Sequence, residues 1–351
     1  MGEQEKGFGR REFIGGSLAA GLGVAGGSAA TAAAAKTKTV KDLPYNPRTF
    51  PAMPTRNLGK TGYQVGILSL GGQATIERQG TEKDSEDIVN RALDLGVNYI
   101  DTAAAYGRGI SETHIGRVMK DRRSETWLAT KTHDRSYDGS MKLLETSLKQ
   151  LQTDHLDTWQ LHNLKTKEDM ERIFAKDGAI NALIKAKEEG MVRCLGITGH
   201  YEPIILADFL KRFEFDTILM AVNAADPHYL SFKKYLLPVA QEKGVGIIGM
   251  KLATRGRMLS CWPPPPIEEQ SRSMATSLPG TITIKETLEY NFSLPVSTNI
   301  IGVDNVEQIE QNAKIASEFT GLNEQQMAEI EYKTLPIVRQ GLYFRRWDMG
   351  A

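Results

Sequence analysis

The sequence TWLATKTHDRSYDGSMKLLETSLKQLQTDHLDTWQLHN, residues 126–163, contains one complete repeat of the fold that we predict for this chain. It starts with an apolar run at 126–130 and closes with a second run at 157–162. Between the two runs, apolar residues recur at helical spacing, at Met141, Leu144, Leu148 and Leu151. The order of strand, helix and strand predicts two parallel strands joined by a crossover helix.

The same alternation continues on both sides of this repeat. Eight apolar runs occur in all, at 65–70, 98–101, 126–130, 157–162, 192–198, 217–223, 245–250 and 297–302. Gly190 and Gly244 stand where helices should end before the next strand. Alternating strands and helices predict a parallel sheet, and eight strands favour closure into a single-domain α/β fold, the (β/α)8 TIM barrel. An open doubly wound sheet is the alternative, but no Gly-x-Gly-x-x-Gly follows the first run.

Composition and charge are those of a globular protein with a large core. The chain has 351 residues, of which 40% are hydrophobic and 25% charged. Lys plus Arg equals Asp plus Glu at 43 each, so net charge gives no reason to expect nucleic acid or an anionic membrane as a partner. The two cysteines, Cys194 and Cys261, make no disulfide framework or metal site, and we expect Cys194 to be an inert core thiol.

The first 35 residues differ from the rest. Arg10 and Arg11 precede Glu-Phe-Ile, and no further charge follows until Lys36. This pattern predicts a removable export signal at 1–35, and it resembles the twin-arginine signal of bacteria. We therefore expect the bacterial export machinery to carry the chain to the periplasm. A disordered tail or an uncleaved anchor is the alternative, although the stretch has too few bulky apolar side chains for stable membrane insertion.

The remaining boundaries follow from composition. Residues 36–54 are polar and rich in proline, which predicts a linker, while 55–320 form the barrel and 321–351 a C-terminal helix and tail. A long loop follows the seventh strand and contains Trp262 and the four prolines 263–266. Loops of this length are usually functional or disordered, so we consider a substrate lid and a surface insertion as equal alternatives.

Four polar residues stand at the ends of consecutive strands. Asp101 ends the second strand and Tyr106 follows it, Lys131 ends the third strand, and His162 ends the fourth. On a barrel these ends share one face, so the four side chains can converge. A carbonyl that accepts hydride needs a proton, which a tyrosine can donate. A nearby ammonium lowers the pKa of the phenol, a carboxylate can pair with that ammonium, and an imidazole can orient the carbonyl.

These residues and their surroundings resemble the aldo-keto reductase superfamily over roughly residues 55–320. The matching stretches are Arg56-Asn57-Leu58-Gly59, Asp101 with Tyr106-Gly107, Ser111-Glu112, Ile115-Gly116, Thr130-Lys131, Glu145 to Lys149 with Leu151, Asp154 with Asp157, Leu161-His162, Val192-Arg193, Gly196-Ile197 and Asn312. The resemblance implies that Tyr106 is the proton donor and that Asp101, Lys131 and His162 support it. It also implies that the protein binds NAD(P)(H).

The resemblance carries a cofactor site over to Gly72, Asn163, Thr198, Gly199, Asn223, Lys251, Gly302, Asp304, Gln308 and Asn312. Many members have Ser-Asn after the fifth strand, where this chain has Thr198-Gly199, so a hydroxyl remains and an amide is missing. Asn223 replaces a frequent Gln at the end of the sixth strand. Lys251 could meet the pyrophosphate as a point charge. His200 and Trp262 are weaker candidates for substrate contacts.

The segment after the eighth strand departs most from the family. Members that prefer NADP place cationic residues here to bind the 2′-phosphate. Residues 302–308 of this chain contain no Lys or Arg, and Asp304 and Glu307 add negative charge. A helix N-terminus favours a phosphate, but two carboxylates oppose a second one. We expect the NADP preference to be weakened or lost, which leaves both NAD and NADP as cofactors.

Taken together, the sequence predicts an enzyme that transfers a hydride between a nicotinamide cofactor and an aldehyde, ketone or alcohol, with sugars among the candidate substrates. A low-turnover sensor or binding module on the same fold is the first alternative, although such a protein has less need of all four polar residues. A metal-dependent barrel hydrolase is a second alternative. It would need several His, Asp or Glu ligands at strand ends, and only His162 is well placed.

Overall fold

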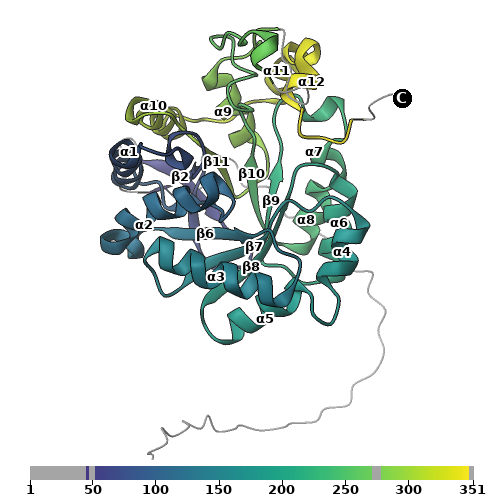
Figure 1. Cartoon of the computed structure of the whole chain (residues 1–351). Coiled ribbons are helices and arrows are strands. Elements are labelled where there is room, and N and C mark those ends of the chain that lie inside the picture. Colours follow the sequence, from purple (N-terminus) through teal and green to yellow (C-terminus); the bar gives the residue numbers. More distant parts are fainter. Residues whose placement is uncertain (1–44, 47–51, 271–277, 348–351) are drawn as a thin grey trace, which may run out of the picture. The chain divides into compact units, whose positions relative to one another are not determined.

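A computed structural model describes residues 45–46, 52–270 and 278–347. The predicted export signal at 1–35, most of the predicted linker and the last residues of the predicted tail lie outside this part of the chain. Eight parallel strands close into a barrel in the order β10-β11-β4-β5-β6-β7-β8-β9. Their bounds are Leu68–Gly71 for β4, Tyr99–Asp101 for β5, Trp127–Thr132 for β6, Leu156–Leu161 for β7, Val192–Gly199 for β8, Thr217–Ala221 for β9, Gly246–Met250 for β10 and Thr298–Ile301 for β11. The predicted α/β barrel is therefore confirmed (Figure 1).

At least one helix follows each barrel strand and packs on its outside. These helices are α1 (Glu82–Asp94), α2 (Ile110–Arg122), α3 (Tyr137–Leu151), α4 (Lys167–Ile173), α5 (Ala179–Glu188), α6 (Pro203–Arg212), α7 (Phe232–Tyr235), α8 (Leu237–Lys243), α9 (Ile284–Ser293) and α10 (Val306–Ser317). Gly190 and Gly244 follow α5 and α8 with positive φ values of 76° and 66°, which confirms the predicted helix ends. Two short helices, α11 (Glu324–Lys333) and α12 (Val338–Gly341), come last.

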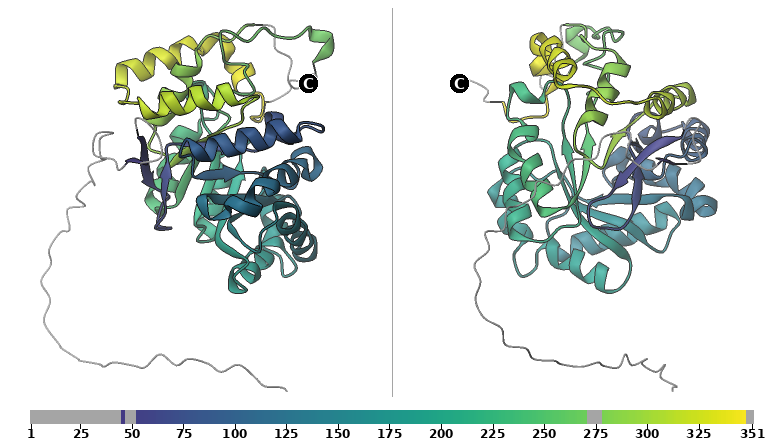
Figure 2. Two further views of the ribbon diagram at one scale, coloured as in Figure 1. Left: turned by 90° about the vertical axis from the view of Figure 1, so that its left-hand side faces the viewer. Right: turned by 180° about the vertical axis from the view of Figure 1, so that it is seen from behind.

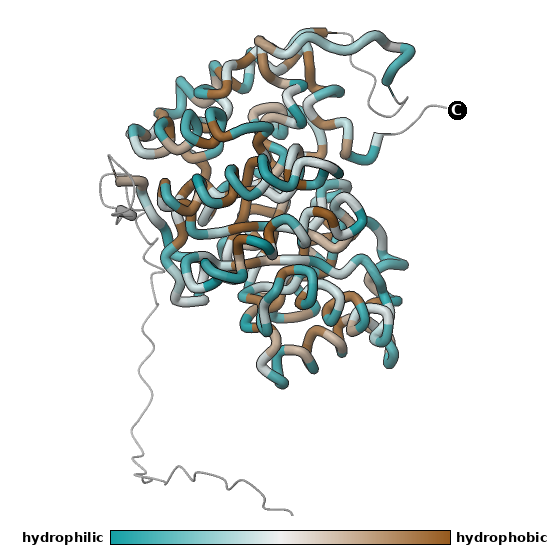
Figure 3. The backbone as a smooth tube through the Cα atoms, turned by 60° about the vertical axis from the view of Figure 1, so that its left-hand side comes forward, coloured by the Kyte–Doolittle hydropathy of each residue, from teal (hydrophilic) through white to brown (hydrophobic). Residues whose placement is uncertain are grey.

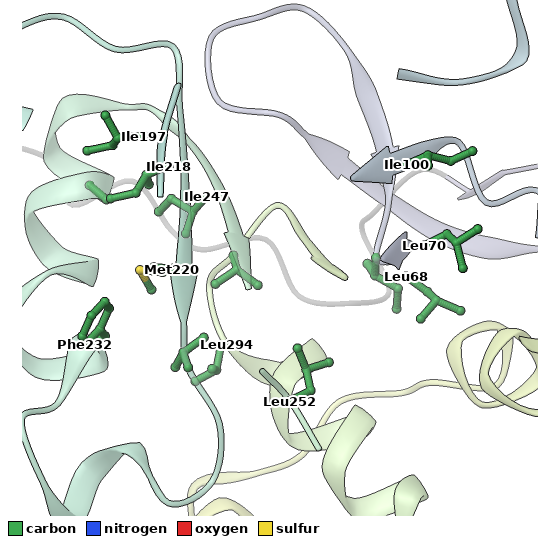
Figure 4. Close-up of a cluster of buried hydrophobic side chains, with 14 of the residues drawn as sticks. Leu68, Leu70, Ile100, Ile197, Ile218, Met220, Phe232, Ile247, Leu252 and Leu294 are labelled. Carbon is green, nitrogen blue, oxygen red and sulfur yellow. The ribbon is translucent and has the colours of Figure 1, made fainter. Parts of the chain in front are cut away.

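The strands bury side chains on both faces, because each strand lies between the barrel interior and the surrounding helices. Leu68, Leu70 and Ile100 belong to the outer layer of this core, against the helices (Figure 4). Tyr99, Trp127 and other residues fill the barrel itself. In Figure 3 the apolar residues accordingly lie mainly along the strands and inner helix faces, and the polar ones along the outside.

A small antiparallel sheet closes one end of the barrel. It consists of β1 (Tyr45–Asn46), β2 (Met53–Asn57) and β3 (Gln64–Gly66). Leu58, in the turn between β2 and β3, is fully buried in the barrel interior cluster. Gly59 has a φ of 53°, and a Cβ there would lie 2.2 Å from the backbone nitrogen of Gly246, where β10 begins. This contact leaves no room for a side chain and closes the N-terminal end, so any site must open at the other end.

This sheet corrects two predictions. The apolar run 65–70 is not one strand, because 64–66 pair with β2 and the barrel strand starts only at Leu68. Met53 and Pro54, assigned to the linker, belong to β2. An apolar run shows burial but does not show in which sheet a residue pairs, since both sheets pack on the same core. Arg56 anchors the sheet by donating to the carbonyl oxygens of Phe292, Leu294 and Val296, at the end of α9.

The long loop after β10 lies at the same end of the barrel as α11 and α12 (Figure 2). Its two described halves meet in a bridge between Leu259 and Ile282. The side chain of Gln340 donates to the carbonyl oxygens of Arg257 and Leu278, at 2.9 and 3.0 Å. The loop is thus fastened to the C-terminal segment. Within the described residues, no helix has the length and apolarity needed to cross a membrane.

Candidate active site

The alternation of side chains along the strands places three polar residues inside the barrel at its open end. Asp101 comes two residues after Tyr99, and Lys131 comes two residues after Ala129, and both Tyr99 and Ala129 face the interior. His162 follows β7 two residues after Gln160, whose side chain reaches Asp101 across the interior. The predicted convergence of Asp101, Lys131 and His162 thus follows from strand geometry and is present in the structure.

Lys131 is held by two acceptors at the end of the neighbouring strand β5. Its ammonium donates to a carboxylate oxygen of Asp101 and, at 2.5 Å, to the carbonyl oxygen of Thr102. Gln160 donates to the other Asp101 oxygen at 3.0 Å. The side chains of Lys131 and Asp101 have no exposed area. Burial alone would lower the pKa of Lys131, but the nearby Asp101 and Tyr106 outweigh burial and raise it, so Lys131 stays an ammonium.

Tyr106 stands at the start of a tight turn, Tyr106–Gly109, after β5. Gly107 has a φ of 57°, and a Cβ there would lie 2.2 Å from the carbonyl oxygen of Glu77, so the turn requires glycine. The turn brings the Tyr106 ring to 4.9 Å from the Lys131 ammonium and to 5.8 Å from the His162 ring, measured between centroids for the two rings. The four predicted catalytic side chains therefore form one group.

The protonation states of Tyr106 and His162 are set mainly by burial. Burial raises the pKa of Tyr106, and Lys131 lowers it as predicted but by less, so the phenol is protonated at neutral pH. Burial, with Lys131 next in effect, holds the pKa of His162 well below its ordinary value, so this imidazole is neutral. A neutral phenol beside a neutral imidazole suits proton donation to a carbonyl oxygen.

Tyr106 and His162 line a cavity of about 770 Å³ at the open end of the barrel. Its other lining residues are Gln73, Asn163, Lys165, Thr198, His200, Tyr201, Met250, Lys251, Arg255, Arg339, Tyr343, Phe344, Arg345 and Trp347. In the described part of the chain, no group of three or more His, Cys, Asp or Glu side chains could hold a metal ion. The cavity has room for a nicotinamide group together with a small carbonyl compound.

Several predicted cofactor residues line this cavity and fit such a ligand. Asn163 has a φ of 56°, and its side-chain oxygen is buried without a hydrogen-bond partner in the described structure. Nδ1 of His200 is also buried without a partner there. Thr198 is buried beside them at the end of β8. Buried polar atoms that lack a protein partner are what a carboxamide or a polar substrate would satisfy.

Lys251 lies at the end of β10, two strands round the barrel from β8 with Thr198 and three from β7, which precedes Asn163. It follows β10, has a φ of 64°, and donates from Nζ to the side-chain oxygen of Gln73 at 3.1 Å. Burial and the charge of Arg255 lower the pKa of Lys251 to about 8. A bound anion would reverse this loss of proton affinity, which fits the predicted contact between Lys251 and a pyrophosphate.

Three other predicted cofactor residues do not line the cavity. A Cβ at Gly72 would lie 2.5 Å from Ser111 Oγ, and one at Gly199 would lie 2.8 Å from the carbonyl oxygen of Leu164, so both glycines serve close packing. The Asn223 amide donates to the backbone of Lys251 and Gly341 and to the hydroxyl of Thr254, and its oxygen accepts from the Ala225 N–H. Asn223 thus holds loops together.

The last group of predicted cofactor residues lies beyond the cavity, at the start of α10. Gly302 lies against the backbone of Gln73, and the Gln308 side chain accepts from the Asp304 N–H at 2.8 Å. Asn312 is buried within α10. Sequence reasoning found no cation here, but Arg78, which precedes α1, forms an ion pair with Asp304 at 3.2 Å. This contact joins residues 226 positions apart, so no local pattern could show it.

The two weaker candidates for substrate contact, His200 and Trp262, differ in their position relative to the cavity. His200 lines the cavity, but Trp262 does not. Trp262 is half-buried and packs on Gly256 and on the guanidinium of Arg257, which lies 5.5 Å from its ring. Of the long loop after β10, only Lys251 and Arg255 among its described residues reach the cavity. The start of this loop thus reaches the cavity, and a substrate lid and a surface insertion both stay predictions.

Sequence reasoning missed the C-terminal segment, which it placed outside the barrel as a tail. Residues 339–347 form one wall of the cavity through Arg339, Tyr343, Phe344, Arg345 and Trp347. Arg345 is completely buried, pairs with Asp226, and donates to the carbonyl oxygens of His200 and Ala221 at 3.0 Å each. The only sequence signal for this wall is the density of aromatic residues and arginines in 343–347.

Comparisons with known proteins agree with the barrel and its site. The model described as "Aldo/keto reductase family" matches residues 64–334. L-galactose dehydrogenase of Arabidopsis thaliana is 28% identical over 308 residues, which cover 80% of this chain and 94% of that protein. An aldo-keto reductase from Bacillus halodurans in its holo form has a TM-score of 0.64 at 26% identity, covering 80% of this chain and 96% of that one.

A solved aldo-keto reductase from Klebsiella pneumoniae in complex with NADPH shares the fold, with a TM-score of 0.61 at 20% identity, over 78% of this chain and 93% of that one. The family model covers more than half of the chain and includes all four polar residues of the site. The chain therefore belongs to the aldo/keto reductase family and is an NAD(P)-dependent oxidoreductase that acts on carbonyl or alcohol carbons.

Proposed function

We propose that Tyr106 is the general acid of carbonyl reduction and the general base of the reverse reaction. The observation that carries this proposal is the grouping of three side chains: the Lys131 ammonium lies 4.9 Å and the His162 ring 5.8 Å from the Tyr106 ring, and Tyr106 and His162 line one cavity. A bound nicotinamide cofactor supplies or accepts the hydride. As negative charge develops on the carbonyl oxygen, Tyr106 gives it a proton, which prevents the cost of a buried alkoxide.

The supporting residues have separate tasks in this proposal. Lys131 stabilises the phenolate that remains after Tyr106 has given up its proton, because its ammonium lies over the phenol ring. Asp101 keeps Lys131 charged and fixes its position. His162, being neutral, can donate one N–H to the carbonyl oxygen and orient it toward Tyr106 without adding charge.

The test is the substitution Tyr106→Phe, with Tyr332→Phe as the control because Tyr332 is 74% exposed on α11. We expect Tyr106→Phe to lose aldehyde reduction by about 10²-fold or more while cofactor binding, followed by fluorescence, stays intact. Unchanged slow turnover in Tyr106→Phe would favour the alternative of a low-turnover sensor or binding module.

For the cofactor, we propose NAD(P)(H) with a weakened preference for NADP. Asp304 and Glu307 place two carboxylates near the start of α10, where a 2′-phosphate is expected. Arg78 brings a guanidinium to the same place, but its ion pair with Asp304 engages it. Comparing kcat/KM for NADPH and NADH with one aldehyde tests this proposal, and a strong preference for NADPH would contradict it.

We propose a sugar or another polyhydroxy carbonyl compound as substrate. Tyr201 and Trp347 give the cavity aromatic walls of the kind on which sugar rings pack, and the relative from Arabidopsis thaliana is named for L-galactose. A screen of sugars and simple aldehydes with each cofactor in turn tests this, and activity confined to apolar aldehydes would contradict it.

We further propose export through the twin-arginine route to the bacterial periplasm, supported by Arg10 and Arg11 and by the absence of charge in residues 13–35. Since nicotinamide cofactors are scarce outside the cytoplasm, the cofactor would be bound before export and stay bound through turnover. Replacing both arginines by lysine should keep the protein out of the periplasmic fraction. Mature protein purified without added cofactor should absorb in the nicotinamide band, and clean apoprotein would contradict retention.

A further inference from the structure

The cavity has an unbalanced charge. Five of its lining residues are cationic: Lys165, Lys251, Arg255, Arg339 and Arg345. None of the lining residues in the described structure is an aspartate or a glutamate. A cavity with cations and no carboxylates attracts anions, and low-dielectric walls increase that attraction. The partners of each cation show which of them remain available to a ligand.

Three of the five cations already have a partner or a predicted task. Arg345 is buried against Asp226. Arg255 lies 3.6 Å from a carboxylate oxygen of Glu77, and Lys251 donates to Gln73. Gln73 follows β4 and Lys251 follows β10, and only β11 separates these two strands in the barrel. This is the side where the cofactor pyrophosphate is expected.

The remaining two, Lys165 and Arg339, contact aromatic rings. The Lys165 ammonium lies 5.8 Å from the centre of the Tyr201 ring, and the Arg339 guanidinium lies 5.5 Å from that of Trp347. In residues 52–270 and 278–347, neither cation has a carboxylate within ion-pair distance. Both side chains are exposed at the cavity mouth, so their N–H groups are open to a ligand.

Lys165 and Arg339 belong to one wall, because the segments that hold them are bound together. The Arg346 N–H donates to the Tyr201 carbonyl oxygen at 3.1 Å. Trp347 stacks on Tyr229 with ring centroids 4.0 Å apart, and the Tyr229 hydroxyl donates to the Arg346 carbonyl oxygen at 2.6 Å. This wall follows β7, β8 and β9. Lys251 follows β10, which pairs with β9, and Gln73 follows β4, two strands farther round the barrel.

We propose that the substrate carries an anionic group, a carboxylate or a phosphate, away from its reacting carbonyl, and that Arg339 and Lys165 bind this group at the cavity mouth. The inference rests on the proposed function, since the carbonyl end must reach Tyr106. Arg339 is the main contact, because a guanidinium can donate two parallel hydrogen bonds to either anion. Trp347 and Tyr201 hold the two cations in place and pack against the body of the substrate.

The experiment compares aldehydes with and without an anionic group. Para-carboxybenzaldehyde is paired with its methyl ester, and glyceraldehyde phosphate with glyceraldehyde, so that the two arms distinguish a carboxylate from a phosphate. We expect at least one anionic aldehyde to have a kcat/KM about tenfold above that of its neutral partner, mainly through KM. Arg339→Gln and Lys165→Gln should each lower this advantage, measured as the ratio of kcat/KM for the anionic aldehyde to that for its neutral partner, and the double substitution should bring the ratio to about one.

Two controls match the charge change without touching the cavity. Arg346→Gln alters the neighbouring guanidinium, which pairs with Glu202 at 3.3 Å and does not line the cavity, and Lys167→Gln alters an exposed lysine at the start of α4. Both variants should keep the higher kcat/KM for the anionic aldehyde. Equal kcat/KM for anionic and neutral aldehydes would overturn the inference and leave the proposed function standing. No reduction of any of the four aldehydes with either cofactor would overturn both.

Discussion

The ammonium nitrogen of Lys131 lies 4.9 Å from the centre of the Tyr106 ring, at the point where burial raises the pKa of that phenol. The two effects oppose each other, because a buried phenolate is costly and a neighbouring cation makes it less so. In the reductive direction the protonated phenol is ready to donate. In the oxidative direction the phenol must first ionise, so Lys131 should matter most there.

Lys131→Met should therefore impair alcohol oxidation more than aldehyde reduction. Without the ammonium the pKa of Tyr106 rises further, so at a given pH less phenolate is available to accept a proton. We expect the rate of oxidation to fall by about 10²-fold or more and its rise with pH to move to higher pH. The check is the pH profile of kcat for oxidation, with Lys167→Met as the control on an exposed lysine.

Asp101 complicates this variant, because removing Lys131 leaves a buried carboxylate unpaired. The double variant Asp101→Asn/Lys131→Met removes that charge as well and should recover stability against urea but not oxidation. An unshifted pH profile in the stable double variant would contradict the assigned role of Lys131.

His200 should make the protein less stable in acid. Burial and the charge of Lys251 lower its pKa to about 3 in the folded protein, from an ordinary value of 6.5. The unfolded chain therefore binds a proton that the folded chain refuses, so stability is complete above pH 6.5 and falls as the pH drops toward 3. The slope is about 1.4 kcal/mol per pH unit for one such histidine.

The measurement is urea unfolding between pH 6.5 and 4.5. His200→Gln should reduce the slope of the unfolding free energy against pH by the equivalent of about one proton. His155→Gln serves as the control, because His155 is partly exposed and lies next to Asp154 at the surface. If His200→Gln and the native chain lost stability in parallel, His200 would have to be protonated in the folded state.

Asp304→Asn should shift cofactor preference toward NADPH. The substitution removes a carboxylate from the start of α10 and releases Arg78 from its ion pair, so the guanidinium can meet a 2′-phosphate. Because the pair is exposed, we expect a change of several-fold in the ratio of kcat/KM for NADPH to that for NADH, on the order of 1 kcal/mol. Asp87→Asn, which breaks an exposed pair with Lys83 on α1, should leave the ratio unchanged. A ratio that moves toward NADH would contradict this arrangement.

Asp226→Ala should destabilise the protein more than Arg345→Met. Asp226 accepts not only from Arg345 but also from the Ser231 hydroxyl and the N–H groups of Phe232 and Lys233. Its loss leaves those donors and a buried guanidinium without a carboxylate, at a cost of about 3–5 kcal/mol. Arg345→Met leaves Asp226 with three donors and should cost less. Urea unfolding of both variants and of Arg346→Met, an exposed control, measures the order, and the reverse order would contradict it.

Strand periodicity explains why so much of the site could be predicted. Asp101 and Lys131 share a face with Tyr99 and Ala129 because side chains alternate along a strand, and parallel strands bring their ends to one face of a barrel. Cys194, predicted as an inert core thiol, is buried, and burial raises its pKa to about 12. These conclusions need only local pattern and topology.

The parts that could not be predicted depend on contacts between distant residues. Arg345 meets Asp226 across 119 positions, and Arg78 meets Asp304 across 226. No periodic pattern marks such pairs, and an arginine in a polar tail has the same local signature whether it is solvated or buried. Trp262 shows the opposite case. It is a candidate for substrate contact as a large aromatic residue in a long loop, but it packs on Gly256 and Arg257.

Two sets of side chains come from separate parts of the sequence. One set is proposed to transfer the proton, and the other lines the cavity where the rest of the substrate would bind. The first set lies between Asp101 and His162, on three neighbouring strands and one turn, while much of the second lies in residues 339–347. A lineage could therefore exchange or lengthen the last segment and acquire a new range of reactants without disturbing the chemistry beneath. For the same reason, a graft of this segment from a relative is the natural starting point for redirecting the enzyme.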